Sequence, residues 1–125
     1  MRNAIHAQAA PKAAGPYSHA IVEGGFIFVS GQGPIDPKTG EYVKGDIRSE
    51  TKRVFDNLRT ILEAAGSSLD KVVKVNVYLR DMGDFAAMNE VYAAHFSTPY
   101  PARTTIQAGA LPRGFGIEIE CTARQ

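Results

Sequence analysis

Cysteine, tryptophan and long apolar runs are scarce or missing in this sequence of 125 residues. Its single cysteine, Cys121, excludes an internal disulfide and a cysteine-rich zinc site. No apolar run approaches the roughly 20 residues that a membrane-spanning helix needs. The N-terminus also lacks the basic segment followed by an apolar stretch that is typical of a secretory signal. We therefore expect a cytoplasmic protein without a membrane anchor.

An excess of charge of either sign is also lacking. The 14 basic and 13 acidic residues leave a net charge of +1, and no long run of one sign occurs. Neither nucleic acid nor an anionic membrane is therefore an expected partner. The length and the 44% hydrophobic content are typical of one globular domain, so residues 1–125 are predicted to share a single core.

The spacing of apolar residues predicts six strands and two helices. The predicted strands are residues 5–8, 18–23, 26–29, 72–79, 103–108 and 115–123. One helix is predicted to run from an Asp46 cap to about Ala65, with Gly66 ending it, and the other from an Asp84 cap through about Phe96. The order is β-β-β-α-β-α-β-β.

This order predicts an α+β fold with a mixed sheet. Each helix buries one stripe, and right-handed crossovers place both helices on the same face of the sheet. The other face then has no helix to cover it and carries polar residues mixed with apolar ones. Because residues 26–29 are apolar on both sides, we expect this strand to be covered twice and the open face to be closed by another subunit.

Arg103 is the residue best suited to bind an anion. A guanidinium matches a carboxylate with two parallel hydrogen bonds, which lysine cannot do. Antiparallel pairing across the following turn would bring Glu118 near Arg103, so the spacing alone favours a structural ion pair between adjacent strands. Glu118 and Glu120 share one side of their strand. They are either a pair of carboxylates for acid–base chemistry or part of an ordinary polar face of the sheet.

Other familiar sites find little support. Ser30-Gly31-Gln32-Gly33 is not a dinucleotide fingerprint, although a glycine at a strand end lets a ligand approach the backbone. The three histidines lack metal-ligand spacing, so no metal site is expected. Cys121 alternates with core residues and is predicted to be buried. No nucleophile elbow occurs for a serine hydrolase.

Several stretches, in their order and spacing, resemble the reactive intermediate deaminase family, also called the YjgF or L-PSP family. They are Gly15-Pro16-Tyr17-Ser18, Val29-Ser30-Gly31-Gln32, Asp36-Pro37-Lys38-Thr39-Gly40-Glu41, Tyr100-Pro101-Ala102-Arg103 and Ile117-Glu118-Ile119-Glu120. The resemblance implies a chorismate-mutase-like fold and a homotrimer whose sheets form a barrel, with active sites between subunits. It also implies a deaminase of 2-iminobutanoate and 2-iminopropanoate that needs no cofactor.

The resemblance assigns roles to individual residues. Arg103 would hold the substrate carboxylate, Glu118 would position or deprotonate water, and Gly31 would contribute main-chain contacts. Tyr17, Asn89, Ser30 and Thr105 complete the predicted substrate-binding set.

This chain departs from the family at two positions. Thr105 stands where many members have cysteine, and His19 stands where glutamine is frequent. Two alternatives stay open: a deaminase of a larger enamine acid such as 2-aminomuconate, and a ligand-binding or RNA-cleaving relative.

Overall fold

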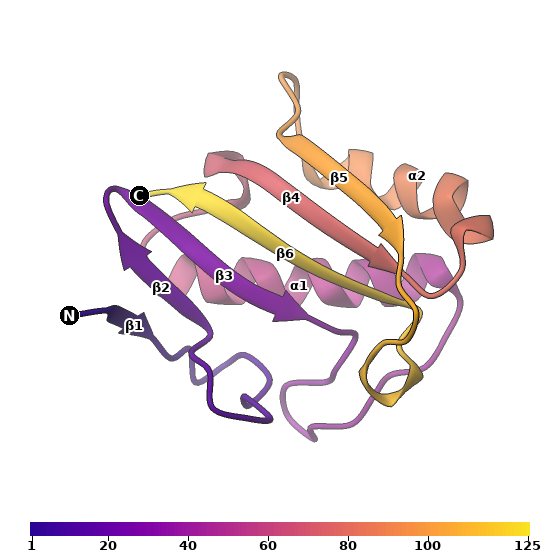
Figure 1. Ribbon diagram of the computed structural model, residues 1–125, viewed down its shortest axis with the longest axis horizontal. Coiled ribbons are helices and arrows are strands. Elements are labelled where there is room, and N and C mark those ends of the chain that lie inside the picture. The colour runs from indigo at the N-terminus through magenta and orange to yellow at the C-terminus, as the bar shows by residue number, and fades with distance from the viewer.

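Two helices lie on one face of a six-stranded sheet in the computed structural model, which describes residues 1–125 (Figure 1). The strands are β1 (Asn3–Ile5), β2 (Ala20–Glu23), β3 (Phe26–Gln32), β4 (Val72–Leu79), β5 (Ala102–Gln107) and β6 (Ile117–Arg124), and the helices are α1 (Ile47–Ala64) and α2 (Phe85–His95). The predicted α+β class, element order and placement of both helices are confirmed.

The sheet order is β1-β2-β3-β6-β4-β5, so the last strand lies between β3 and β4. All neighbours are antiparallel except β4 and β5, which run parallel because α2 connects them as a crossover. The sheet is therefore mixed, as predicted.

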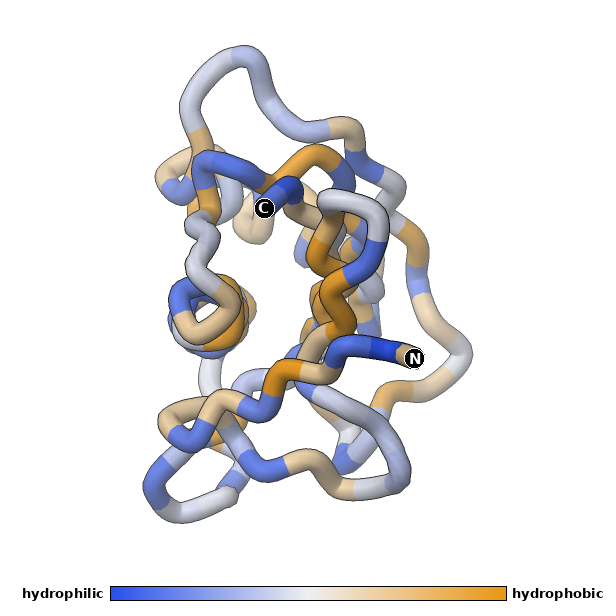
Figure 2. The backbone as a smooth tube through the Cα atoms, turned by 90° about the vertical axis from the view of Figure 1, so that its left-hand side faces the viewer, coloured by the Kyte–Doolittle hydropathy of each residue, from blue (hydrophilic) through white to orange (hydrophobic).

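The α1 helix is defined at both ends by the predicted residues. The Asp46 side chain accepts a hydrogen bond from the Ser49 backbone N–H at 2.8 Å, and Gly66 follows the helix with a φ of +77°. In Figure 2 this helix is seen nearly end-on, with its hydrophobic side turned toward the strands. Its buried residues Phe55, Leu58, Ile61 and Leu62 form one core with the inner face of the sheet.

Some local predictions are wrong. The edge strand predicted at residues 5–8 is Asn3–Ile5, because the chain turns away from β2 after residue 5. Asp84 does not cap α2 with its side chain; Asp81 instead caps a short 3₁₀ turn that leads into this helix. The last strand begins at Ile117, because Arg113 and Gly114 form a turn with positive φ.

The sheet face opposite the helices is open. Phe26 and Phe28 are 43% and 48% exposed on it, whereas Ile27 and Val29 are buried on the helix side. A single chain thus covers only one face of residues 26–29, and cover of the other face by another subunit stays a prediction. Neither helix combines the length and the hydrophobicity that crossing a lipid bilayer requires.

Candidate active site

A cavity of about 510 Å³ opens where β3 and β6 meet the N-terminal loop. Its lining residues are Pro11, Lys12, Ala14, Tyr17, Ser30, Gly31, Gln32, Gly33, Ile35, Pro112, Arg113, Phe115, Glu118 and Glu120. Four of the predicted site residues are thus brought together: Tyr17, Ser30, Gly31 and Glu118.

Gly31 lies directly against the Glu118 carboxyl group. The register between β3 and β6 shifts between Val29 and Gln32, which bulges the strand at Ser30 and Gly31. A Cβ atom on Gly31 would lie 3.0 Å from the Glu118 carboxyl carbon and from one of its oxygens. The Ser30 hydroxyl donates to the Ser18 carbonyl at 2.6 Å, which anchors this bulge to the preceding segment.

Glu118 is half-buried beside a second carboxylate. Burial, and to a smaller extent the charge of Glu120, raise the pKa of Glu118 above its ordinary value. Glu120 itself accepts hydrogen bonds from the Tyr78 hydroxyl and from the Asn76 amide, the latter at 3.5 Å. The hydrogen bond to Glu120 raises the pKa of Tyr78 to about 12, so Tyr78 stays a donor to Glu120.

Arg103 lies at a second, smaller cavity of about 290 Å³ beside α2. Its guanidinium donates to the Asn89 side-chain oxygen at 2.7 Å. The guanidinium carbon lies 4.6 Å from the Tyr92 ring centroid and 5.5 Å from that of Phe85, so aromatic faces hold the fork in place. Tyr100 and Pro101 complete the approach to this cavity.

Arg103 has no carboxylate partner in the chain. The two ion pairs of the structure are Arg48 with Glu90 and Arg59 with Asp56. The alternative of a structural ion pair between Arg103 and Glu118 is therefore wrong. An arginine held by an amide and two rings keeps the capacity to bind a carboxylate from outside the chain.

The expected closeness of Arg103 and Glu118 is also wrong. Strand β5 pairs with β4 and not with β6, because the segment between residues 108 and 116 carries the chain past β4. Arg103 aligns with the buried Val75 on the helix side of the sheet, whereas Glu118 aligns with Tyr78 on the open side. One chain thus holds two separate groups, the Glu118 cavity and the Arg103 cavity.

Two hydroxyls beneath α2 have no hydrogen-bond partner. They are the buried oxygens of Thr105, on the same side of β5 as Arg103, and of Tyr92, whose ring lies under the guanidinium. Burial raises the pKa of Tyr92 to about 12. An unpaired buried hydroxyl costs about 1–3 kcal/mol. Thr105, a predicted substrate-binding residue, lines neither the Glu118 cavity nor the Arg103 cavity.

Sequence reasoning missed Phe115 in the Glu118 cavity and Tyr78, which donates to the lining residue Glu120. It also missed Tyr92 as the support of Arg103. The alternation of Asn76 and Tyr78 with valines was the available signal for Tyr78, since it placed that ring on the polar face. Tyr92 is buried. No pattern in the sequence connects it with Arg103.

The remaining candidates take no part in this geometry. Cys121 is buried in the core, and burial raises the pKa of its thiol to about 12, so it is not a nucleophile. The buried His19 bonds with the backbone at Ala7 and Pro11. No group of three potential metal ligands occurs.

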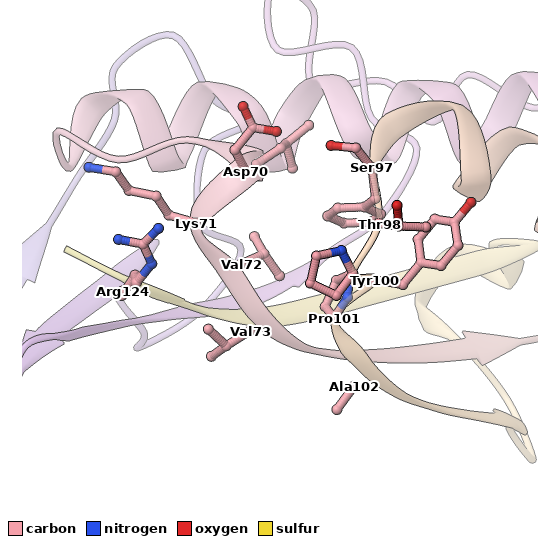
Figure 3. A pocket seen from close by; sticks show the side chains of 13 residues that line it. Asp70, Lys71, Val72, Val73, Ser97, Thr98, Tyr100, Pro101, Ala102 and Arg124 are labelled. Carbon is pink, nitrogen blue, oxygen red and sulfur yellow. The ribbon is translucent and has the colours of Figure 1, made fainter.

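A third cavity, of about 440 Å³, lies between the start of β4 and the loop before β5 (Figure 3). Figure 3 shows Lys71 and Arg124 at one end and Tyr100 and Pro101 at the other. None of the predicted site residues lines it.

Comparison with known proteins gives concordant results. The family model described as Endoribonuclease L-PSP matches residues 7–125. A RutC family protein of Pyrococcus horikoshii is 55% identical over 123 residues, which are 98% of each chain. A 2-iminobutanoate/2-iminopropanoate deaminase of Mus musculus is 44% identical, covering 100% of this chain and 93% of its own. The crystal structure of RidA from the Antarctic bacterium Psychrobacter superposes with a TM-score of 0.94 at 45% identity, covering 99% of this chain and 100% of that one.

Proposed function

This chain belongs to the L-PSP family, and from that premise we propose that it is a deaminase that hydrolyses small 2-imino acids, and their enamine tautomers, to 2-keto acids and ammonia. The likeness to the mouse deaminase over the full length of this chain supports reactive-intermediate deamination in general. Within that class, 2-aminoacrylate and 2-aminocrotonate are the substrates we propose.

The observation that carries this proposal is the unpaired guanidinium of Arg103. It is oriented by Asn89 and by the Tyr92 ring, and it lies beside a cavity instead of in an ion pair. Each charged hydrogen bond to a substrate carboxylate contributes about 1.5–3 kcal/mol.

We propose that the active site is completed by a second copy of the chain. Arg103 and Glu118 lie on opposite faces of the sheet, so one chain alone does not present both to one small acid. The open face, with its exposed Phe26 and Phe28, provides an apolar surface for self-association. In a homotrimer, the Arg103 cavity of one subunit would face the Glu118 cavity of its neighbour.

The reaction needs only positioned groups and water. Arg103 fixes the carboxylate of the imine, and the ionised Glu118 accepts a proton from water as its oxygen bonds to the imine carbon. The electron pair of the C=N bond moves to nitrogen, which takes up the proton held by Glu118 and gives a carbinolamine. Glu118 then takes the proton of the carbinolamine hydroxyl and passes it to the nitrogen. The C–N bond breaks as the C=O bond forms, and ammonia and the 2-keto acid are released. The raised pKa of Glu118 makes it a stronger base than an ordinary carboxylate.

The test uses 2-aminoacrylate generated in place by a serine dehydratase that depends on pyridoxal phosphate. Release of pyruvate above the uncatalysed rate is expected from the wild type. Arg103→Ala, and also Arg103→Lys, should lose about 100-fold or more in kcat/KM, because lysine lacks the two-pronged geometry. Arg59→Ala, on the surface of α1, removes a comparable charge and should leave the rate unchanged. Equal rates for wild type and Arg103→Ala would remove the proposed role.

RNA cleavage is the second candidate, because the matching family model is described as an endoribonuclease. The net charge of +1 argues against it, since binding RNA requires basic residues that neutralise phosphates. Incubation with a single-stranded RNA at low salt is expected to give no Arg103-dependent cleavage. Adding 2-aminomuconate as a second imine source separates the proposal from the deaminase of a larger acid.

A further inference from the structure

Besides Thr51, helix α1 buries two polar side chains at the edge of its hydrophobic stripe. Glu50 and Asn57 are 2% and 1% exposed, and they lie seven residues apart, which is two helical turns and therefore one side of the helix. Neither lines the Glu118 cavity. Burying a carboxylate without an ion pair is costly, so its hydrogen-bond partners identify what it stabilises.

Glu50 binds the wall of the cavity that leads to Glu118. One of its carboxylate oxygens accepts the Gly116 N–H at 2.9 Å; the other accepts the Tyr42 hydroxyl at 2.8 Å and the Gly45 N–H at 3.2 Å. Gly116 precedes Glu118 by two residues. A Cβ on Gly116 would lie 3.0 Å from the Glu50 oxygen, so the backbone is in direct contact with the carboxylate.

Asn57 binds the wall that follows Gly31. Its amide donates to the Gly33 carbonyl at 3.1 Å and to the Ile35 carbonyl at 2.9 Å. This fixes the backbone two residues beyond Gly31. Both carbonyls are bound by the same side-chain nitrogen, so a small rotation of Asn57 affects both contacts.

The two walls touch each other through Phe115. A Cβ on Gly33 would lie 2.3 Å from the Phe115 ring, which means that the ring packs on bare backbone. The Tyr42 ring meets Phe115 edge to face, with centroids 4.9 Å apart, and the Tyr42 hydroxyl is the one that Glu50 binds. Arg80 holds the same segment from the other side, with hydrogen bonds to the Gly114 and Gly116 carbonyls. Contacts that end on α1 therefore hold the segments next to Gly31 and Glu118.

We propose that Glu50 and Asn57 are positioning residues that fix the Gly31 bulge and the Glu118 carboxylate relative to each other, and thereby determine the turnover rate of the imine hydrolysis. The claim about turnover rate rests on the proposed function, whereas the claim about positioning does not. The Gly31 backbone packs closely against the Glu118 carboxyl group, because a Cβ on Gly31 would lie only 3.0 Å from that group. Misplacing a reacting group by about 1 Å can cost about 100-fold in rate.

The kinetic test compares Glu50→Ala and Asn57→Ala with a neighbouring buried control. Both variants should lower kcat by about 10- to 100-fold. KM should change by less than about 3-fold, because the substrate carboxylate is bound by the Arg103 of a neighbouring subunit, which neither substitution touches. Glu50→Gln keeps one oxygen for the Gly116 N–H and should recover most of the lost kcat. The control, Thr51→Val, alters a fully buried side chain whose hydroxyl bonds only within α1, and it should keep the wild-type kcat.

Hydrogen exchange of a peptide covering residues 112–118 tests the same contacts without any substrate. Glu50→Ala should speed exchange in this segment, whereas Thr51→Val should not. Tyr42→Phe removes one hydrogen bond to Glu50 and serves if Glu50→Ala does not fold. An inactive wild type with faster exchange in Glu50→Ala would refute the proposed function but keep the positioning role. Equal kcat and exchange in Glu50→Ala, Tyr42→Phe and Thr51→Val would overturn the inference.

Discussion

Gly31 has no room for a side chain beside the Glu118 carboxyl group. Its φ is not in the left-handed region, so the backbone accepts alanine, but the added methyl would lie 3.0 Å from the carboxyl group. We expect Gly31→Ala to displace Glu118 and to lower kcat/KM for imine hydrolysis by about 10- to 100-fold. Gly109→Ala is the matched control, because the space around Gly109 is open. Equal kinetics for the two variants would mean that the Glu118 carboxyl group yields without cost.

The charge of Glu120 contributes to the raised pKa of Glu118. Burial is the larger cause of the raised pKa of Glu118, and the negative charge of Glu120 adds to it. The proposed base must be ionised, so the rate should fall as pH drops through this raised pKa. Glu120→Gln removes the charge, lowers the pKa of Glu118 and should move the acid limb of kcat to lower pH. An unmoved limb in a pH–rate profile would assign it to another group.

The same shift has a consequence for stability. The folded protein binds the Glu118 proton more tightly than the unfolded chain does, because the folded pKa is the higher one. The contribution of Glu118 to stability is therefore favourable below the ordinary carboxyl pKa and declines as pH rises toward the raised value.

At the scale of elements, Phe55 connects the two helices. Its ring is buried, stacks on His95 with centroids 4.3 Å apart, and meets Tyr92 and Phe96 edge to face. We expect Phe55→Ala to lower the free energy of unfolding by about 3–5 kcal/mol. Val43→Ala, on an exposed loop, should change it by less than about 0.5 kcal/mol. Urea denaturation followed by circular dichroism measures both, and a loss below about 1 kcal/mol for Phe55→Ala would contradict this packing.

Most elements were predictable because their patterns are local. Alternation and helical spacing set the six strands and two helices, and Asp46 and Gly66 marked the ends of α1. The errors fall where local chemistry competes, as at Asp84, whose predicted cap is displaced by the Asp81 turn. The buried Glu50 and Asn57 gave no signal, because polar residues within a helix usually face water.

At the scale of the molecule, the residues that line the Glu118 cavity were predictable, but the separation of this cavity from Arg103 was not. One cavity is lined by the four residues that the family resemblance placed together, Tyr17, Ser30, Gly31 and Glu118. The position of Arg103 relative to Glu118 depends on the pairing of β6 between β3 and β4. This pairing joins segments far apart in the sequence, so the alternation of residues within one strand does not predict it.

Assembly follows from this separation of the two cavities. Light scattering should give about three times the chain mass of 13.5 kDa. Arg103→Ala and Glu118→Ala chains, each inactive alone, should regain activity when mixed during refolding. Random mixing in a ring of three gives a complete pair at about one quarter of the sites. A mixture as inactive as its components, or a monomeric mass, would exclude a site shared between chains.

The only thiol of the chain is buried in the core, so the surface carries no native cysteine for a thiol-reactive label. With Cys121 buried and its thiol protonated at neutral pH, maleimide dyes have nothing native to attack. A cysteine placed on any exposed loop would carry the fluorophore alone, and motions of that loop would be read without removing a native residue first.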